Sequence, residues 1–496
     1  MSTEIPHFIA SSPRTGTSGR TAPVYDPATG AVSAHVGLAA AEEVDAAVAT
    51  ALEAFGSWRR SSLAQRTKLL FRFRNLVEQN TDRLAQAVSS EHGKVLDDAR
   101  GEVARGLENI EYACGIGELL KGTVSEQAST GVDVVTVRQP LGVVAGITPF
   151  NFPAMVPLWM IPNALACGNT FVLKPSEKDP SAPLLLAELA AEAGFPEGVL
   201  NVVQGDKEAV DRLLDHPDVR AVSFVGSTPV ARAIHQRASA AGKRVQALGG
   251  AKNHMVVLPD ADVGVAADAA VSAAYGSAGE RCMAISVVVA VGEVADPLVE
   301  ALRERATALR VGPGSDPSSE MGPLITAEHR DRVAGYVDQG REAGALVVVD
   351  GRESALPSEG FFLGPCLLDR VQPEMSVYTD EIFGPVLSVV RCDTYPEALD
   401  LINACPYGNG VSLFTRDGGA ARRFQEDVEV GMVGINVPIP VPVGSHSFGG
   451  WKDSLFGDAH MYGPEGVRFF TRAKAITTRW PDPSESRVDL GFPRND

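Results

Sequence analysis

The sequence predicts an α/β protein with two doubly wound parallel sheets, each covered by helices on both faces. The first observation is that short apolar runs alternate with helix-patterned stretches over residues 142–240, which is the pattern of repeated β-α-β units. The second is that the alternation resumes after Gly250, with the runs NHMVVLP and ISVVVAV. The third is the length of 496 residues, which at about 150 residues per domain allows for more than one domain.

The first 141 residues precede the predicted sheets. Residues 1–36 are rich in Ser, Thr, Pro and Gly, and indicate an extended segment with a turn at 26–30. Apolar residues at helical spacing then run from Ala41 to about Leu120. We therefore expect a helical layer, followed by a short β-rich piece, VDVVTVRQP (132–140).

The predicted strands of the first sheet are almost continuously apolar, as expected for buried parallel strands. They lie at 142–147, 170–175, 199–203 and 219–226. The helices between and after them start near Ala154, Ser181, Lys207 and Thr228. Ligands of such sheets bind at the carboxyl ends of the strands, so we expect the site there.

The second half repeats this organisation. Helices are predicted from Val263 to about Ala278 and from Pro297 to about Leu309, with Gly- and Pro-rich loops at 312–323 and 434–450. The late apolar segment KAITTRW (474–480) is expected to be a strand that completes a sheet elsewhere in the molecule.

Composition argues against several function classes. With 44 basic and 62 acidic residues the net charge is −18, so we expect no nucleic-acid partner and no attraction to anionic membranes. Prolines interrupt the longest apolar stretch, 152–166, and no transmembrane helix is expected. The N-terminus lacks a secretory apolar core and the six cysteines are scattered, so we expect a cytoplasmic protein without disulfides. No spacing of His and carboxylates suggests a metal site.

One cysteine stands in a distinctive setting. Cys282 lies in YGSAGERCMA, a Gly-, Ser- and Ala-rich turn between a predicted helix and a predicted strand. Backbone N–H groups in such a turn can stabilise a thiolate, which is the reactive form of cysteine. The alternative is a small buried apolar side chain, the usual state of a free cysteine.

Six motifs together resemble the aldehyde dehydrogenase superfamily. They are ITPFNFP (147–153), FVLKPSE (171–177), FVGST (224–228), LGGAKNH (248–254), GERC (279–282) and EIFGPV (381–386). The resemblance implies an NAD-binding domain of residues 1–122 and 142–247 and a catalytic domain of residues 248–448. It also implies a small β arm of residues 123–141 and 465–482 that joins subunits of a homodimer or homotetramer.

The resemblance also assigns roles to residues. Cys282 is expected to attack the aldehyde, and Asn151 is expected to stabilise the resulting oxyanion together with the Cys282 N–H. The expected NAD-binding residues are Thr148, Phe150, Lys174, Glu177, Lys178, Ser227, Gly249 and Glu381. A carboxylate on the ribose hydroxyls repels a 2′-phosphate, so Glu177 favours NAD over NADP, although Lys178 lies beside it.

One departure from the superfamily pattern is informative. Hydrolytic members carry a glutamate in E-L-G-G-K that activates water, whereas this chain has Ala247 before Leu-Gly-Gly. Without that base a Cys282 thioester should wait for a better nucleophile, such as the thiol of coenzyme A. In this respect, and in the motifs GAKNH and AGERCMA, the chain resembles CoA-acylating methylmalonate-semialdehyde dehydrogenases.

That subfamily implies a substrate with a carboxylate. The expected reaction is NAD- and CoA-dependent oxidative decarboxylation of methylmalonate or malonate semialdehyde, which yields propionyl-CoA or acetyl-CoA. Arg281, directly before the nucleophile, and Arg105, in GEVARGLENIE, are the expected carboxylate-binding residues. Without the resemblance, Arg105 would be taken for a solvated side chain and Arg281 for an ion-pair partner of Glu280.

Two other readings stay open. The chain could be a hydrolytic aldehyde dehydrogenase of another semialdehyde, with Glu280 or a loop carboxylate as the base. It could also be a non-catalytic protein that keeps the fold, although a structural role alone does not require Cys282, Asn151, Lys174 and Glu381 together.

Overall fold

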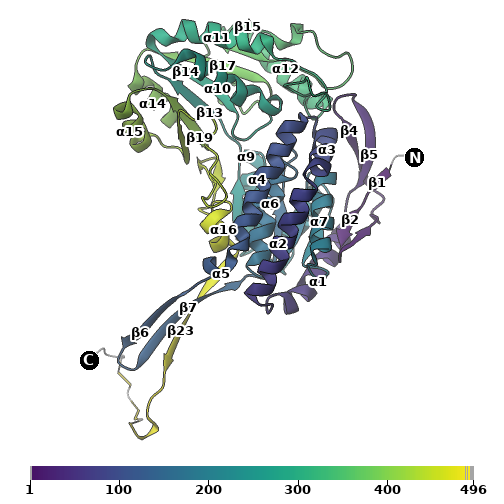
Figure 1. Cartoon of the computed structure of the whole chain (residues 1–496), viewed down its shortest axis with the longest axis vertical. Coiled ribbons are helices and arrows are strands. Elements are labelled where there is room, and N and C mark those ends of the chain that lie inside the picture. Colours follow the sequence, from purple (N-terminus) through teal and green to yellow (C-terminus); the bar gives the residue numbers. More distant parts are fainter. Residues whose placement is uncertain (1–2, 486, 489, 492–496) are drawn as a thin grey trace.

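Two open sheets with helices on both faces form the body of the molecule, and a narrow three-stranded arm projects from it (Figure 1). The structure is a computed structural model and describes residues 3–485, 487–488 and 490–491. The fold class is therefore the predicted one, α/β with two doubly wound sheets and a small β arm.

The first sheet has eight strands in the order β22-β12-β11-β8-β9-β10-β2-β3. The five central strands are parallel, and β22, β2 and β3 run antiparallel to their neighbours. The central strands are β8 (Val143–Ile147), β9 (Thr170–Lys174), β10 (Leu200–Val202), β11 (Val219–Val225) and β12 (Arg244–Leu248). The edge strands are β2 (His7–Ile9), β3 (Ser12–Arg14) and β22 (Leu455–Phe456).

Helices cover both faces of this sheet, each over its own apolar cluster. One face carries α1 (Ala41–Trp58), α8 (Lys207–Asp215) and α9 (Thr228–Ala240). The other carries α2 (Leu63–Gln79), α3 (Thr81–His92), α4 (Leu96–Cys114), α6 (Met155–Ala166) and α7 (Ser181–Ala193), with α5 (Ile116–Leu119) after α4. The predicted helices and strand runs are thus present, but the helices of residues 41–120 do not form one layer, because α1 lies on the opposite face from α2, α3 and α4.

The second sheet has seven strands in the order β15-β16-β17-β14-β13-β19-β20, all parallel except β15. Its strands are β13 (Asn253–Val257), β14 (Ile285–Val291), β15 (Leu346–Val349), β16 (Cys366–Asp369), β17 (Val386–Cys392), β19 (Gly410–Phe414) and β20 (Met432–Ile435). Its helices are α10 (Val263–Tyr275), α11 (Ala295–Ala308), α12 (Ala327–Glu342), α13 (Ser376–Thr379), α14 (Tyr395–Ala404) and α15 (Gly418–Asp427).

The arm joins distant parts of the chain. Its strands β6 (Thr123–Ser129), β7 (Val132–Pro140) and β23 (Thr471–Arg479) are antiparallel, with β7 in the middle. The late apolar segment is thus a strand in a sheet elsewhere in the molecule, as expected. It follows α16 (Gly463–Phe469). The domain boundaries themselves stay a prediction.

The N-terminal segment contains more regular structure than expected. Besides β2 and β3, it forms a small sheet of β1 (Thr3–Ile5), β5 (Ala31–Gly37) and β4 (Thr21–Asp26). The predicted turn at 26–30 joins β4 to β5, closed by Gly30 N–H donating to the Asp26 carbonyl. A two-stranded pair, β18 (Tyr407–Gly408) and β21 (Trp451–Lys452), completes the strands. Within the described residues, no helix is long and apolar enough to cross a membrane.

Candidate active site

The candidate site lies where the strand order of the first sheet reverses. Chain order runs outward from β8 to β9 and β10 on one side, and from β11 to β12 on the other. The loops after β8 and β11 therefore diverge and leave a crevice at their carboxyl ends, the expected ligand position in such a sheet. The loop after β8 carries Phe150 and Asn151, and the loop after β11 carries Gly226 and Ser227.

Cys282 reaches this crevice from the second sheet. It follows the 3-10 turn η1 (Gly276–Gly279), in which Ser277 and Ala278 have φ of 53° and 51°, and it precedes β14. Gly279 is required there, because a Cβ would lie 2.3 Å from the Gly384 carbonyl oxygen. The Cys282 carbonyl accepts hydrogen bonds from the Nδ2 atoms of Asn253 (2.9 Å) and Asn409 (3.1 Å), which fix the backbone of the thiol residue.

The thiol is protonated at neutral pH in this environment. Burial, and then the nearby Glu381 carboxylate, raise the pKa of Cys282 to about 12. Burial also raises the pKa of Glu381 to about 7, so this carboxylate titrates near neutrality. A positive charge beside the thiol would be needed to favour the thiolate.

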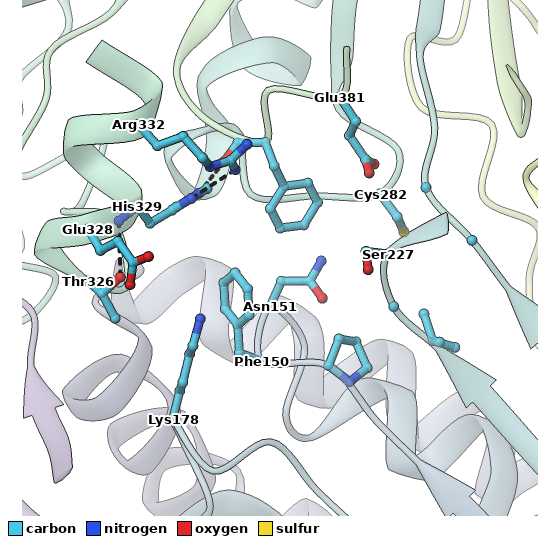
Figure 2. A pocket seen from close by; sticks show the side chains of 16 residues that line it. Phe150, Asn151, Lys178, Ser227, Cys282, Thr326, Glu328, His329, Arg332 and Glu381 are labelled. Atoms are coloured by element: carbon cyan, nitrogen blue, oxygen red, sulfur yellow. Dashed lines mark hydrogen bonds between the residues drawn. The ribbon is translucent and has the colours of Figure 1, made fainter. Parts of the chain in front are cut away.

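Asn151 and Cys282 line one cavity of about 540 Å³ (Figure 2). The Asn151 side chain donates from Nδ2 to the Glu280 carbonyl at 2.9 Å, which uses one of its two amide hydrogens and leaves the other available. Of the predicted residues, the cavity also brings together Phe150, Lys178, Ser227, Gly249 and Glu381.

A second cavity of about 770 Å³ continues from the first along the sheet edge. The two share Phe150, Lys178 and Ser227 in their linings. The remaining predicted cofactor residues, Thr148, Lys174 and Glu177, line only the second. Lys174 Nζ lies 3.2 Å from Glu177 Oε2, and Lys178 Nζ lies 4.9 Å from the centre of the Phe150 ring.

These cavities fit an extended dinucleotide. The far cavity has apolar walls from α8 and α9, among them Leu214, Val230 and Ile234, with the Glu177 carboxylate at its rim. At the near end, Glu381 accepts the Ala251 N–H at 2.9 Å, and a Cβ on Gly250 would lie 2.1 Å from its Oε2. The Thr148 hydroxyl is buried and has no hydrogen-bond partner among the described residues.

A third cavity of about 480 Å³ approaches Cys282 with both predicted arginines, Arg105 and Arg281, in its lining. Arg281 Nη2 lies 2.7 Å from Asp98 Oδ1, so its ion-pair partner is Asp98 and not the adjacent Glu280. Although burial opposes it, the charges of Lys94 and Arg281 lower the pKa of Asp98. Arg105 is paired with Glu108 at 2.8 Å and is partly exposed. Each of the two guanidinium groups in the cavity lining is therefore already paired with one carboxylate of the protein.

Glu280 lines none of the three cavities described above that lie near Cys282. Its side chain is fully buried, and its carboxyl oxygens lie 3.6 Å from His92 Nε2 and 3.3 Å from His329 Nε2. Burial raises the pKa of Glu280 well above its usual value. A carboxyl group that has no exposed surface and lines none of the cavities of Cys282 has no access to water at the thiol, so Glu280 does not fit the role of an alternative base.

The β12 residue on the thiol's side of the sheet differs from the one that the sequence predicts. Side chains alternate between the two faces of β12. Ala247 packs into the apolar cluster formed with α9, on the far face of the sheet. Leu248 belongs to the opposite cluster, against which Cys282 packs. The strand residue on the thiol's side is therefore Leu248 rather than Ala247, and neither side chain carries a carboxylate.

The wall of the 540 Å³ cavity opposite Lys178 contains residues that were not predicted from the sequence. It is formed by the start of α12 and the loop after α13, with Thr326, Glu328, His329, Arg332 and Phe383 (Figure 2). Arg332 Nη2 lies 3.0 Å from His329 Nδ1, and His329 Nε2 lies 2.7 Å from the Phe383 carbonyl. None of the quoted motifs contains His329 or Arg332, so only the tertiary fold brings this cation to the crevice. Among the described residues, no group of His, Cys, Asp and Glu is arranged to hold a metal ion.

The family of the chain follows from comparison with known proteins. The model of the aldehyde dehydrogenase family matches residues 14–476. The chain therefore belongs to the aldehyde dehydrogenase family.

Several similar proteins in the family are named malonate- or methylmalonate-semialdehyde dehydrogenase. A malonate-semialdehyde dehydrogenase from Pseudomonas aeruginosa is 56% identical over 491 residues, which cover 98% of this chain and 99% of that protein. The crystal structure of methylmalonate-semialdehyde dehydrogenase from Oceanimonas doudoroffii has a TM-score of 0.96 at 53% identity, covering 98% of this chain and 99% of that one. A Sinorhizobium meliloti structure assigned to the same activity and complexed with NAD has a TM-score of 0.96 at 51% identity. It covers 98% of this chain and 100% of that one.

Proposed function

We propose that this chain oxidises malonate or methylmalonate semialdehyde with NAD and transfers the decarboxylated acyl group to coenzyme A, giving acetyl-CoA or propionyl-CoA. The names of the similar proteins support the substrate class. The observation that carries the acyl-transfer step is that the β12 residue on the thiol's side of the sheet is Leu248, which offers no base.

In the first half-reaction, the Cys282 thiol loses its proton to solvent, its sulfur bonds to the aldehyde carbon, and the carbonyl oxygen becomes an oxyanion. The free amide hydrogen of Asn151 and the Cys282 N–H stabilise that charge. Collapse of the oxyanion re-forms the carbonyl and expels hydride, which leaves a thioester on Cys282. Bound NAD supplies a cationic nicotinamide ring that favours the thiolate and accepts the hydride.

The residues of the crevice fit NAD. Lys174 and Glu177 would hold the adenosine ribose, Lys178 and Ser227 the pyrophosphate, and Glu381 the nicotinamide ribose. Thr148, Phe150 and Gly249 would line the path between them. The Glu177 carboxylate disfavours a 2′-phosphate, and the Sinorhizobium meliloti structure was solved with NAD.

The substrate carboxylate would lie between Arg281 and Arg105 in the third cavity. Because each arginine already binds Asp98 or Glu108, the substrate would share these guanidinium groups rather than meet free ones. Once the thioester has formed, the bond to this β-carboxylate can break. Carbon dioxide leaves, the electron pair passes into the thioester carbonyl as an enolate, and protonation of the enolate carbon gives acetyl- or propionyl-Cys282.

In the second half-reaction, the CoA thiolate bonds to the thioester carbon and the Cys282 thiolate leaves. Water would compete only with the help of a base. Leu248 is apolar and Glu280 is fully buried outside the cavities of Cys282, so the thioester is expected to persist until CoA arrives.

We further infer a homo-oligomer in the cytoplasm. The arm strands β6 and β23 leave Val124 and Ile476 exposed on a sheet that extends away from the body, a surface suited to a second copy of the chain. All six cysteines are free thiols, as is usual in a reducing compartment.

A second candidate function rests on Glu381. This carboxylate lines the same cavity as Cys282, and its pKa of about 7 suits a general base. If it activates water after the cofactor leaves, the enzyme is hydrolytic and releases a free acid.

One assay separates the two functions. Purified protein is supplied with malonate semialdehyde and NAD, with and without CoA, and NADH and the acyl product are measured. Sustained NADH formation only with CoA, with acetyl-CoA as product, supports acyl transfer. Sustained formation without CoA, with a free acid as product, would establish the hydrolytic function instead.

A further inference from the structure

One face of α4 lines the cavity that holds the two arginines. Asp98, Glu102 and Arg105 are spaced four and three residues apart and all border that cavity. Asp98 pairs with Arg281 and Arg105 faces the cavity, but Glu102 is almost fully buried and has a different partner. That partner is Lys94, two residues before the helix, whose side chain has no exposed surface.

Lys94 and Glu102 form a buried ion pair with 2.8 Å between Nζ and Oε2. A buried ion pair adds little net stability compared with apolar residues of the same volume, because both charges must leave water. The position of this pair therefore needs another explanation, and its remaining hydrogen bonds supply one.

Those bonds hold the middle and the C-terminal end of the loop that carries Asn151. Lys94 Nζ donates to the Asn151 carbonyl oxygen at 2.7 Å and lies 4.2 Å from the centre of the Phe152 ring. Glu102 Oε1 accepts the N–H groups of Ala154 (2.8 Å) and Met155 (3.1 Å).

The bonds to Glu102 also cap α6. Its N-cap residue is Ala154, whose side chain makes no capping hydrogen bond, so Glu102 supplies from α4 the acceptor that a local serine or aspartate usually provides. The start of α6 and the Asn151 backbone are thus tied to the same buried pair.

We propose that Lys94 and Glu102 are positioning residues for oxyanion stabilisation, because they fix the backbone from which the Asn151 amide reaches the oxyanion. The inference rests on the proposed role of Asn151. An oxyanion donor acts only at its correct distance from the developing charge, and a displacement of about 1 Å can cost on the order of 100-fold in rate.

The test is the double substitution Lys94→Met with Glu102→Gln, which removes both charges and leaves no unpaired ion in the interior. The amide introduced by Glu102→Gln keeps an oxygen for the Ala154 N–H, so mainly the hold on Asn151 is lost. The rate of NADH formation in the first turnover with malonate semialdehyde is expected to fall about 10- to 100-fold. The Kd of NAD, measured by protein fluorescence, is expected to stay within about twofold, since these side chains lie outside the cofactor cavities.

A rate loss alone would also follow from general damage, so the double substitution is combined with Asn151→Ala. If the pair acts through Asn151, it costs no further rate once the Asn151 amide is gone, because the two effects share one cause. The inference would be overturned if the combined variant lost rate by the product of the Asn151→Ala loss and the double-substitution loss. It would also be overturned if Lys94→Met/Glu102→Gln left the first-turnover rate unchanged. A full rate in Asn151→Ala alone would instead refute the proposed role of Asn151.

Two further variants guard against loss of folding. Lys243→Met is the matched control: Lys243 is also a buried lysine that donates to backbone carbonyls, including that of Val219 at 2.8 Å, but it lies outside the site. It should lower the Tm without slowing the first turnover. If the double variant does not fold, Glu102→Asp alone is used, which keeps both charges but shortens the side chain by one methylene and so loosens its contacts with Lys94 and Ala154. It should give a smaller rate loss that again vanishes in the Asn151→Ala background, and a loss that persists there would contradict the inference.

Discussion

The substitution Leu248→Glu should convert the acyl-transfer enzyme into a hydrolytic one. It places a carboxylate at the strand position on the thiol's side, where the structure has an apolar side chain that is only 2% exposed. A positioned general base accelerates proton transfer by about 100- to 10,000-fold, so CoA-independent turnover should rise by a factor in that range. The lost apolar burial should cost about 1.5–3 kcal/mol of stability, the desolvation of the carboxylate adds to that cost, and the Tm should fall by at least several degrees.

The strand itself provides the matched control. Ala247→Glu introduces the same charge one residue earlier, on the face that packs against α9, and should destabilise the protein without creating hydrolysis. Leu248→Gln changes the shape in the same way without a base. The assay follows NADH beyond the first turnover in the absence of CoA and identifies the free acid. A gain with Ala247→Glu but not with Leu248→Glu, or an equal gain with Leu248→Gln, would refute the assignment of the two faces.

Two other changes probe the substrate site and the buried charges. Arg105→Ala should lower kcat/KM for malonate semialdehyde about tenfold, because a partly exposed charged hydrogen bond contributes about 1.5 kcal/mol, while propanal should be unaffected. Arg100→Ala, on the same helix but paired with Asp82, is its control, and equal losses on both aldehydes would contradict carboxylate binding. Burial raises the pKa of Glu91 from 4.5 to about 7, so the folded state binds the proton of this carboxyl group more tightly than the unfolded state does, and protonation stabilises the fold. That stabilisation is complete below pH 4.5 and is lost as the pH rises through 7. Glu91→Gln should therefore flatten the fall in Tm between about pH 4.5 and 7, and an unchanged slope would contradict the shift.

Four parallel strands of the first sheet could be predicted because they are mostly apolar, whereas the fifth, β12, contains Arg244 and Gln246 and was not among the predicted strands. β8 and β9 are buried at every position, and such runs are hard to place except between layers of helices. The N-terminal strands β2 and β3 could not be predicted, because they are three residues long and one contains Pro13. Short edge strands form through pairing with a completed sheet rather than through their own pattern.

The site could be predicted in part for a similar reason. Motifs locate residues next to strand ends, and those residues do meet in the crevice. A motif does not show which way a side chain faces at the end of a strand. The sequence therefore indicates Ala247 as the position that lacks a base, whereas in the structure Leu248 is the residue on the thiol's side of the sheet. Nor could the pairing of Arg281 with Asp98 be read from the sequence, because 183 residues separate the two and the neighbouring Glu280 offers a local partner.

The helix α4 links these observations. It supplies Asp98 to Arg281, Arg105 to the cavity and Glu102 to the loop of Asn151, so one rigid element sets the geometry of substrate and oxyanion sites together. Sites built on helices hold their geometry more closely than sites built on loops.

The most direct measurement is the mass of the Cys282 peptide after the protein reacts with malonate semialdehyde and NAD without CoA. The account predicts one equivalent of NADH and a stable acetyl group on Cys282, which added CoA removes as acetyl-CoA. Unmodified Cys282 with NADH still accumulating would contradict it, because water would then be completing the reaction. Cys282→Ala should give neither NADH nor an adduct.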